Sequence, residues 1–125
     1  MLNLILRARP LLASAIVLLL PFSGLHAADL QSGKAVFTST CAVCHGPAGS
    51  PDPDNPVVQG LGVVPADLSD PLFNSREPTG DWEMVVKHGG HAMGLAAQMP
   101  PHNESLSDAQ VADVTAYVKS LVDTS

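Results

Sequence analysis

The sequence predicts an all-α domain in which two helices near its ends enclose a long irregular middle. Apolar residues recur at helical spacing in two segments, roughly 29–42 and 107–121. Between them, the segment 46–101 contains nine prolines and eight glycines. No segment shows the alternating pattern of a strand, and no internal repeat is visible.

Residues 1–27 have the composition of an export signal. Arg7 and Arg9 form a positive start, and an apolar run (11–22) and small alanines follow. This run is shorter than the roughly 20 apolar residues that a membrane-spanning helix needs. We therefore expect a signal peptide over residues 1–27, cleaved to leave one exported domain over 28–125 with no integral membrane span.

The charge of the chain limits its partners. The whole sequence has 6 basic and 12 acidic residues, a formal net charge of −6. The segment 28–125, without the signal, contains all 12 acidic residues and only four basic ones, which gives it a net charge of −8. Those bases are Lys34, Arg76, Lys87 and Lys119. Because binding a nucleic acid needs a basic surface, we expect no nucleic-acid partner.

Both long helices have clear start signals. Asp29 is the expected N-cap of the first, over roughly residues 29–42. The residues from Ser107 to Gln110 form a capping box that opens the last helix. Its apolar stripe consists of Val111, Val114, Val118 and Leu121.

The middle segment leans toward disorder by composition, because so much of it is proline and glycine. Two short helices are expected within it. One opens with Asp70-Pro71 as N-cap and N1, and the other covers 79–88 and ends at Gly89-Gly90. The long helices have too few apolar side chains for a secure core in so small a domain. The sequence therefore predicts a large apolar bound group.

The residues Cys41-Ala42-Val43-Cys44-His45 read C-x-x-C-H, the attachment signature of c-type haem. Residues three apart at a helix end share one face, so both thiols can reach neighbouring vinyl groups of a haem. The next residue can then bring its imidazole to the iron. We predict one covalent haem c, attached through Cys41 and Cys44, with His45 as an axial iron ligand.

Three other interpretations of this motif are open. A redox C-x-x-C of the thioredoxin type needs a βαβ context, which is missing here. Two cysteines in an oxidising compartment can form a disulfide. A structural zinc site needs four ligands, and the fourth would be a histidine elsewhere in the chain: His88, His91 or His102. The adjacent histidine favours haem attachment over all three.

From residue 28 onward the chain resembles a small class I monohaem cytochrome c of the bacterial periplasmic type. Besides C-x-x-C-H, the resemblance rests on Gly33 and Phe37, on Tyr117 in the run Ala-Tyr-Val-Lys-Ser-Leu, and on Met99-Pro100-Pro101. It implies the cytochrome c fold. In that fold the N- and C-terminal helices cross, a glycine lets their backbones approach, and short helices and long Pro/Gly-rich loops wrap one haem.

The resemblance also makes the second axial ligand a methionine on a loop before the last helix. Met99 fits this place, because prolines stiffen the loop after it and the capping box of the last helix follows shortly. Met93, in a glycine-rich stretch, is the alternative sixth ligand. Met84, which lies within the helix expected over 79–88, is expected to pack in the core. A histidine ligand or an open iron is the other possibility.

One further contact is expected behind the histidine. A ligating imidazole usually donates its other N–H to a backbone carbonyl, which fixes the ring. The family uses a proline carbonyl, and Pro65 resembles that position, with Pro56 as an alternative. Trp82 is expected to line the haem pocket, to hydrogen-bond a haem propionate, or to close its own helix as a core residue.

These features predict a soluble periplasmic electron carrier, not an enzyme, that moves one electron at a time between redox protein partners. Ligation by His45 and Met99 raises the reduction potential and leaves no open position on the iron. The negative charge predicts partners with basic docking surfaces, and a monomer is the default. Two alternatives stay open: a fixed haem subunit of a larger dehydrogenase or oxidase complex, and a haem peroxidase or ligand sensor.

Overall fold

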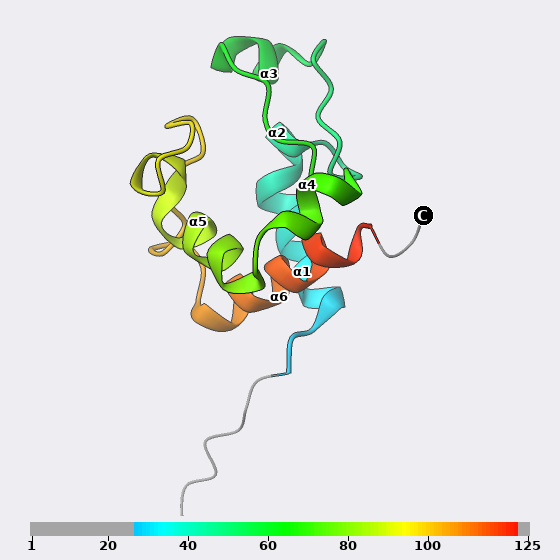
Figure 1. The fold of residues 1–125 in the computed structure, drawn as a ribbon, viewed down its shortest axis with the longest axis vertical. Coiled ribbons are helices and arrows are strands. Elements are labelled where there is room, and N and C mark those ends of the chain that lie inside the picture. The colour runs from blue at the N-terminus through cyan, green and yellow to red at the C-terminus, as the bar shows by residue number, and fades with distance from the viewer. Residues whose placement is uncertain (1–26, 123–125) are drawn as a thin grey trace, which may run out of the picture.

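The computed structural model describes residues 27–122, and over this range the chain is helical without strands, as the sequence predicts. The elements are α1 (Leu30–Val36), the π-helical turn η1 (Phe37–Cys41), α2 (Ala42–His45), α3 (Pro56–Leu61), α4 (Pro71–Arg76), α5 (Thr79–Ala92) and α6 (Asp108–Ser120). In Figure 1, α1, η1 and α2 form one column that α6 crosses at its α1 end, while α3 lies at the opposite end. The expected signal peptide falls almost wholly outside the described residues.

The start signals act as the sequence predicts. The Asp29 carboxylate accepts hydrogen bonds from the backbone N–H groups of the first turn of α1, and both bonds of the capping box form at the start of α6. The Asp70 carboxylate likewise caps α4, where Pro71 occupies the first helical position. Helical geometry in α5 is interrupted at Gly89, with φ 77° and ψ 165°, where the sequence places the end of this helix.

Two local features differ from the expectation. The first helical column does not end near residue 42 but continues through η1 to His45, so the whole C-x-x-C-H motif is helical. A third short helix, α3, opens with Asn55 as N-cap and Pro56 at N1. This is the same signal as Asp70-Pro71, with the asparagine amide oxygen in place of the carboxylate. No helix among the described residues is long and apolar enough to span a membrane.

The crossing of α1 and α6 depends on Gly33. A Cβ atom at this position would lie 2.0 Å from the backbone oxygen of Asp113 and 2.9 Å from the Cβ of Tyr117. Beside this contact the fully buried ring of Phe37 packs on the ring of Tyr117, with centroids 5.4 Å apart. The Asp29 N–H also donates to the Asp113 carboxylate at 2.8 Å. The close approach expected of a glycine at this crossing is confirmed.

A polar clasp holds α4 to the end of α6. The side chain of Asn74, only 1% exposed, donates to the carbonyl oxygens of Leu68 (2.8 Å) and Val118 (2.9 Å). Lys119 donates in return to the carbonyl oxygens of Asn74 and Glu77. Because these bonds join groups far apart in the sequence, the clasp ties the middle segment to the last helix.

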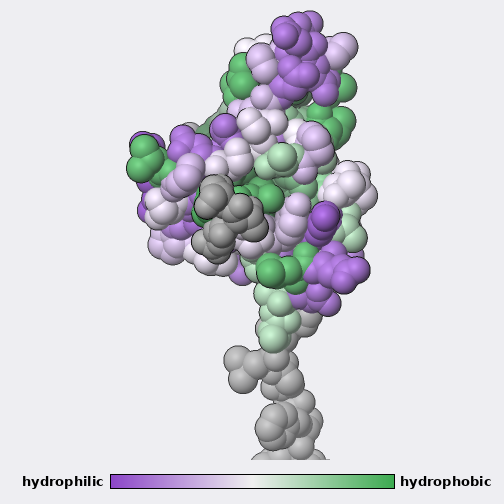
Figure 2. Space-filling model, turned by 90° about the vertical axis from the view of Figure 1, so that its right-hand side faces the viewer, coloured by the Kyte–Doolittle hydropathy of each residue, from purple (hydrophilic) through white to green (hydrophobic). Residues whose placement is uncertain are grey.

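The side-chain core is small, as the sequence predicts. Among the described residues the buried apolar side chains are Val36, Phe37, Val58, Leu68, Val111, Val114 and Val118. On the part of the face that Figure 2 draws in colour, hydrophilic and hydrophobic residues are interspersed. Many other apolar side chains line a cavity that is partly open to solvent.

Candidate functional site

A cavity of about 690 Å³ lies inside the domain. Its walls come from η1, α2, the segment 61–68, α5, the loop that follows α5, and α6, and most of the lining side chains are apolar. The four residues predicted to attach the haem or ligate its iron all line it: Cys41, Cys44, His45 and Met99. The fold thus brings the C-x-x-C-H motif and the methionine of the Met-Pro-Pro run to one space, although the whole middle segment separates them in the sequence.

Cys41 closes η1, and Cys44 lies one helical turn later in α2. Both are half-buried, and they form no disulfide with each other. Burial, reinforced by electrostatic repulsion from Cys44, raises the pKa of the Cys41 thiol to about 11, so this group stays protonated at neutral pH. Within residues 27–122 no three His, Cys, Asp or Glu side chains gather as a metal site. The arrangement therefore gives no support to the zinc interpretation.

His45 is the last residue of α2 and is half-buried. Its Nδ1 lies 3.1 Å from the backbone oxygen of Ala66, so the ring can donate there and keep Nε2 as an acceptor. Burial lowers the pKa of His45, and the hydrogen bond to Ala66 opposes this only in part. The imidazole is therefore neutral at neutral pH, which is the form that binds a metal.

The carbonyl behind His45 belongs to Ala66, not to the predicted Pro65. Pro65 is the preceding residue and lines the cavity. A proline fixes its own φ angle but does not decide which of two consecutive carbonyl groups faces the ring. The predicted segment is right and the predicted residue is wrong by one position. Pro56, the alternative, lies at the start of α3.

The methionines differ in their placement. Met99 is half-buried and lines the cavity, and Met93 lines it as well but is 38% exposed. Met84 is 43% exposed and does not line the cavity, so the expectation that it packs in the core is wrong. His102 also lines the cavity, whereas His88 and His91 are exposed and do not.

Trp82 lines the cavity from α5 and also packs against the core cluster. Its ring makes an edge contact with Phe73, with centroids 5.6 Å apart. The ammonium group of Lys119 lies 4.5 Å from the centre of the Trp82 ring, within cation–π range. Trp82 therefore serves both as pocket wall and as core residue.

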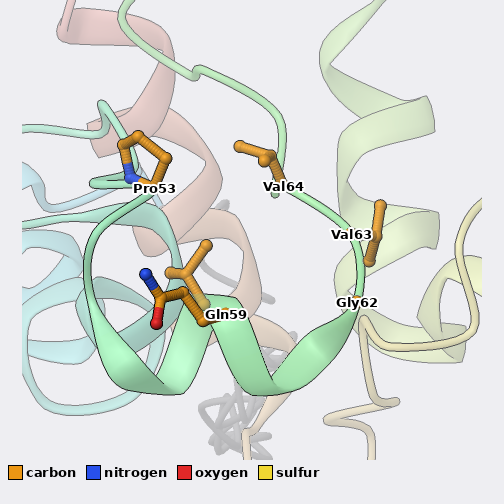
Figure 3. Close-up of a pocket in the computed structure, with 6 residues that line it drawn as sticks. Pro53, Gln59, Gly62, Val63 and Val64 are labelled. Carbon is orange, nitrogen blue, oxygen red and sulfur yellow. The ribbon is translucent and has the colours of Figure 1, made fainter.

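A second, shallower hollow of about 340 Å³ lies beside the cavity, over α3 (Figure 3). Val63 and Val64 line both spaces and so form part of the wall between them. Gln59 is the one polar side chain in the lining of this hollow, which offers no thiol, imidazole or carboxylate. The larger cavity is therefore the candidate functional site.

The large cavity fits a haem by its size and by its donor groups. It is mostly apolar, as a macrocycle requires, and it carries two thiols, one neutral imidazole and one thioether. The hydroxyl of Thr115 adds an independent sign of a bound group. It is fully buried in the cavity wall and has no hydrogen-bond partner within residues 27–122. Buried polar atoms without a partner are rare in native proteins.

The sign of the effect of Thr115→Val on the haem-loaded protein tests this interpretation. If the hydroxyl is bonded to the bound group or to a water beside it, the substitution lowers the free energy of unfolding by about 1 kcal/mol. We expect this result in denaturant titrations followed by circular dichroism. An increase in stability of similar size would mean that the hydroxyl is unpaired in the loaded protein too.

Sequence reasoning did not identify two residues of this site, Ala66 and Thr115, nor the role of Gly90 in the loop beside it. Ala66 and Thr115 are ordinary residue types whose roles come only from tertiary contacts. Gly90 is predicted from the sequence solely as part of a helix stop, yet a Cβ at this position would lie 2.1 Å from the backbone oxygen of Ala96. The only signal in the sequence for this close packing is that a second glycine, Gly90, follows Gly89 at the predicted helix end.

Comparison with known proteins identifies the family. The family model described as "Cytochrome c" matches residues 30–122. Cytochrome c-555 of Prosthecochloris aestuarii is 31% identical over 96 residues, which cover 72% of this chain and 85% of that protein. Among solved structures, the KustC0563 c-type cytochrome shares the fold, with a TM-score of 0.57 at 20% identity, covering 71% of this chain and 95% of that one. This chain belongs to the cytochrome c family: it is an electron-transfer protein, not an enzyme, and its cofactor is covalently attached haem c.

Proposed function

We propose that this cytochrome is a periplasmic one-electron carrier with one haem attached to Cys41 and Cys44, whose iron is ligated by His45 and Met99. The observation that supports this most strongly is the single cavity that all four side chains line. Met93 lines it too and is the alternative sixth ligand. When bound, the haem supplies an iron that is stable as both Fe(III) and Fe(II).

The protein's residues prepare this site for electron transfer in which the iron keeps its ligands and no substrate reacts. The thiols of Cys41 and Cys44 hold the cofactor covalently, so a domain with a small core does not lose it. The bond to Ala66 orients the His45 ring and leaves Nε2 for the iron. The Met99 thioether favours Fe(II) and raises the potential. Ligation by both His45 and Met99 would leave no open position for a substrate on the iron.

The proposed ligand is tested by comparing Met99→Ala with Met93→Ala. The oxidised wild-type protein should show the weak charge-transfer band of an iron–thioether bond. We expect Met99→Ala to lose this band and its reduced form to bind carbon monoxide. Met93→Ala is the matched control and should keep the band. The reverse pattern would transfer the ligand role to Met93.

We also propose that residues 1–27 are a cleaved signal peptide and that residues 28–125 form the mature domain. The positive start, the short apolar run and the small residues after it support this. Export would place the protein in the periplasm. We propose that it is a monomer there, and its negative charge argues against a nucleic-acid partner. The intact mass of protein purified from the periplasmic fraction gives both the cleavage position and the number of haems.

The strong negative charge supports redox partners with basic docking surfaces. Of the twelve acids, eleven lie within the described residues, and Asp52, Asp54, Asp67 and Asp70 are exposed ones in the middle segment. Attraction to a basic partner speeds encounter and weakens as salt screens it. With a basic redox protein as the probe, we expect the second-order electron-transfer rate constant to fall about tenfold or more as ionic strength rises from low to near-molar salt. A rate constant that does not change with salt would contradict the docking proposal.

A further inference from the structure

We infer that the glycine pair Gly89-Gly90, assisted by Gln98, sets the position of Met99 in the cavity. These are positioning residues, since none is proposed to bind the iron. The inference rests on the proposed role of Met99 as the sixth ligand. It explains how an irregular, mostly exposed loop can hold a thioether at one place.

The backbone of Gly90 is the anchor of the loop. Its N–H donates to the carbonyl oxygen of Met99 at 2.9 Å. Its carbonyl oxygen accepts from the N–H groups of Met93 (3.0 Å) and Leu95 (2.8 Å). The loop between the two candidate methionines therefore folds back onto one residue, which fixes where the Met99 backbone lies.

Only glycine fits at this anchor. A Cβ on Gly90 would lie 2.1 Å from the backbone oxygen of Ala96 and 3.3 Å from the Cβ of Met99. A Cβ on Gly89 would lie 2.9 Å from the backbone oxygen of Met99, and the positive φ of Gly89 is one that other residues rarely adopt. Both glycines are buried against this loop.

The outer side of the loop has a separate tie. The side-chain amide of Gln98 donates to the carbonyl oxygen of Leu61, at the end of α3, at 3.3 Å. The chain after the loop is fixed to α5, because the N–H of His102 donates to the carbonyl oxygen of Val86 at 3.0 Å. Met99 thus lies between an inner anchor on α5 and an outer tie to α3.

The decisive comparison uses two glycines that are equally crowded. A Cβ would meet a backbone carbonyl oxygen at 2.1 Å from Gly90 and at 2.0 Å from Gly33. Gly33 lies at the helix crossing and outside the cavity lining, so Gly33→Ala lowers stability without moving Met99. For the holoprotein we expect Gly90→Ala to lose the iron–thioether charge-transfer band and to bind carbon monoxide when reduced. Gly33→Ala should keep the band up to its own unfolding transition.

The outcomes distinguish failure of this inference from failure of the proposal that Met99 is the sixth ligand. If Gly90→Ala keeps the band and excludes carbon monoxide, the inference is wrong even though Met99→Ala loses the band. If Met99→Ala itself keeps the band, the ligand proposal fails instead.

If Gly90→Ala does not accumulate as folded protein, substitution of the exposed residue Gln98 provides the test instead. On heating, Gln98→Ala should lose the band several degrees below the wild type, with an unchanged unfolding midpoint. Gln59→Ala, an exposed glutamine on α3, is its control and should match the wild type. Loss of the band at the wild-type temperature in Gln98→Ala would overturn the inference.

Discussion

Replacing Gly33 with alanine is expected to lower the free energy of unfolding by about 2–4 kcal/mol. The added methyl group would lie 2.0 Å from the backbone oxygen of Asp113, so α1 and α6 must separate. Separation loosens the packing of Phe37 on Tyr117 and the bond from the Asp29 N–H to the Asp113 carboxylate. The better helix propensity of alanine offsets only about 1 kcal/mol of this loss in the free energy of unfolding. The measurement is denaturant unfolding of the holoprotein followed by circular dichroism.

Gly80→Ala is the matched control for this prediction. Gly80 also lies in a helix, but a Cβ there would have no neighbour within 4 Å. Because only helix propensity changes, we expect this variant to equal the wild type or to gain up to about 1 kcal/mol. Equal stability of the Gly33 and Gly80 variants would show that the helix crossing does not need a glycine.

Replacing both Cys41 and Cys44 with alanine is expected to abolish covalent haem attachment and, with it, the folded domain. Few apolar side chains are buried by protein alone, and the remainder of the apolar interior faces a cavity of about 690 Å³. If the haem is absent or is free to dissociate from a cavity of this size, the middle segment has no surface to pack on. Haem staining after denaturing electrophoresis and circular dichroism of the purified protein measure the two losses.

The single variants refine this prediction. Cys41→Ala and Cys44→Ala each leave one thiol, so each should retain covalent haem at reduced yield. Thr38→Ala is the control, because Thr38 is exposed on the same helical turn η1 and does not line the cavity. Covalent haem in the double variant would rule out these cysteines as the points of attachment.

Features that depend on neighbouring residues could be predicted from the sequence. Asp29, Asp70 and Ser107 each cap a helix through bonds to residues two or three positions later, so a short window of sequence contains the whole interaction. Asn55-Pro56 carries the same kind of signal before α3. This helix, absent from the expectation, was therefore also predictable from local sequence.

Features that depend on distant residues could be predicted only in part. The cofactor followed from the C-x-x-C-H motif, and the helix crossing from a family resemblance carried in part by Gly33 and Tyr117. The bond from His45 to Ala66 and the anchoring of Met99 on Gly90 join segments whose relative position is set by the whole fold. Neither hydrophobic periodicity nor capping patterns contain that information. The exposure of Met84 shows the same limit, because a methionine within a helix can face inward or outward.

The most direct test of the proposed electron carrier is the absorption spectrum of the exported wild-type protein, recorded oxidised, reduced, and reduced under carbon monoxide. Ligation by His45 and Met99 predicts low-spin c-type bands, a weak iron–thioether charge-transfer band in the oxidised form, and no change on adding carbon monoxide. A high-spin spectrum that shifts promptly with carbon monoxide would contradict the proposal, because it would show an iron with an open sixth position.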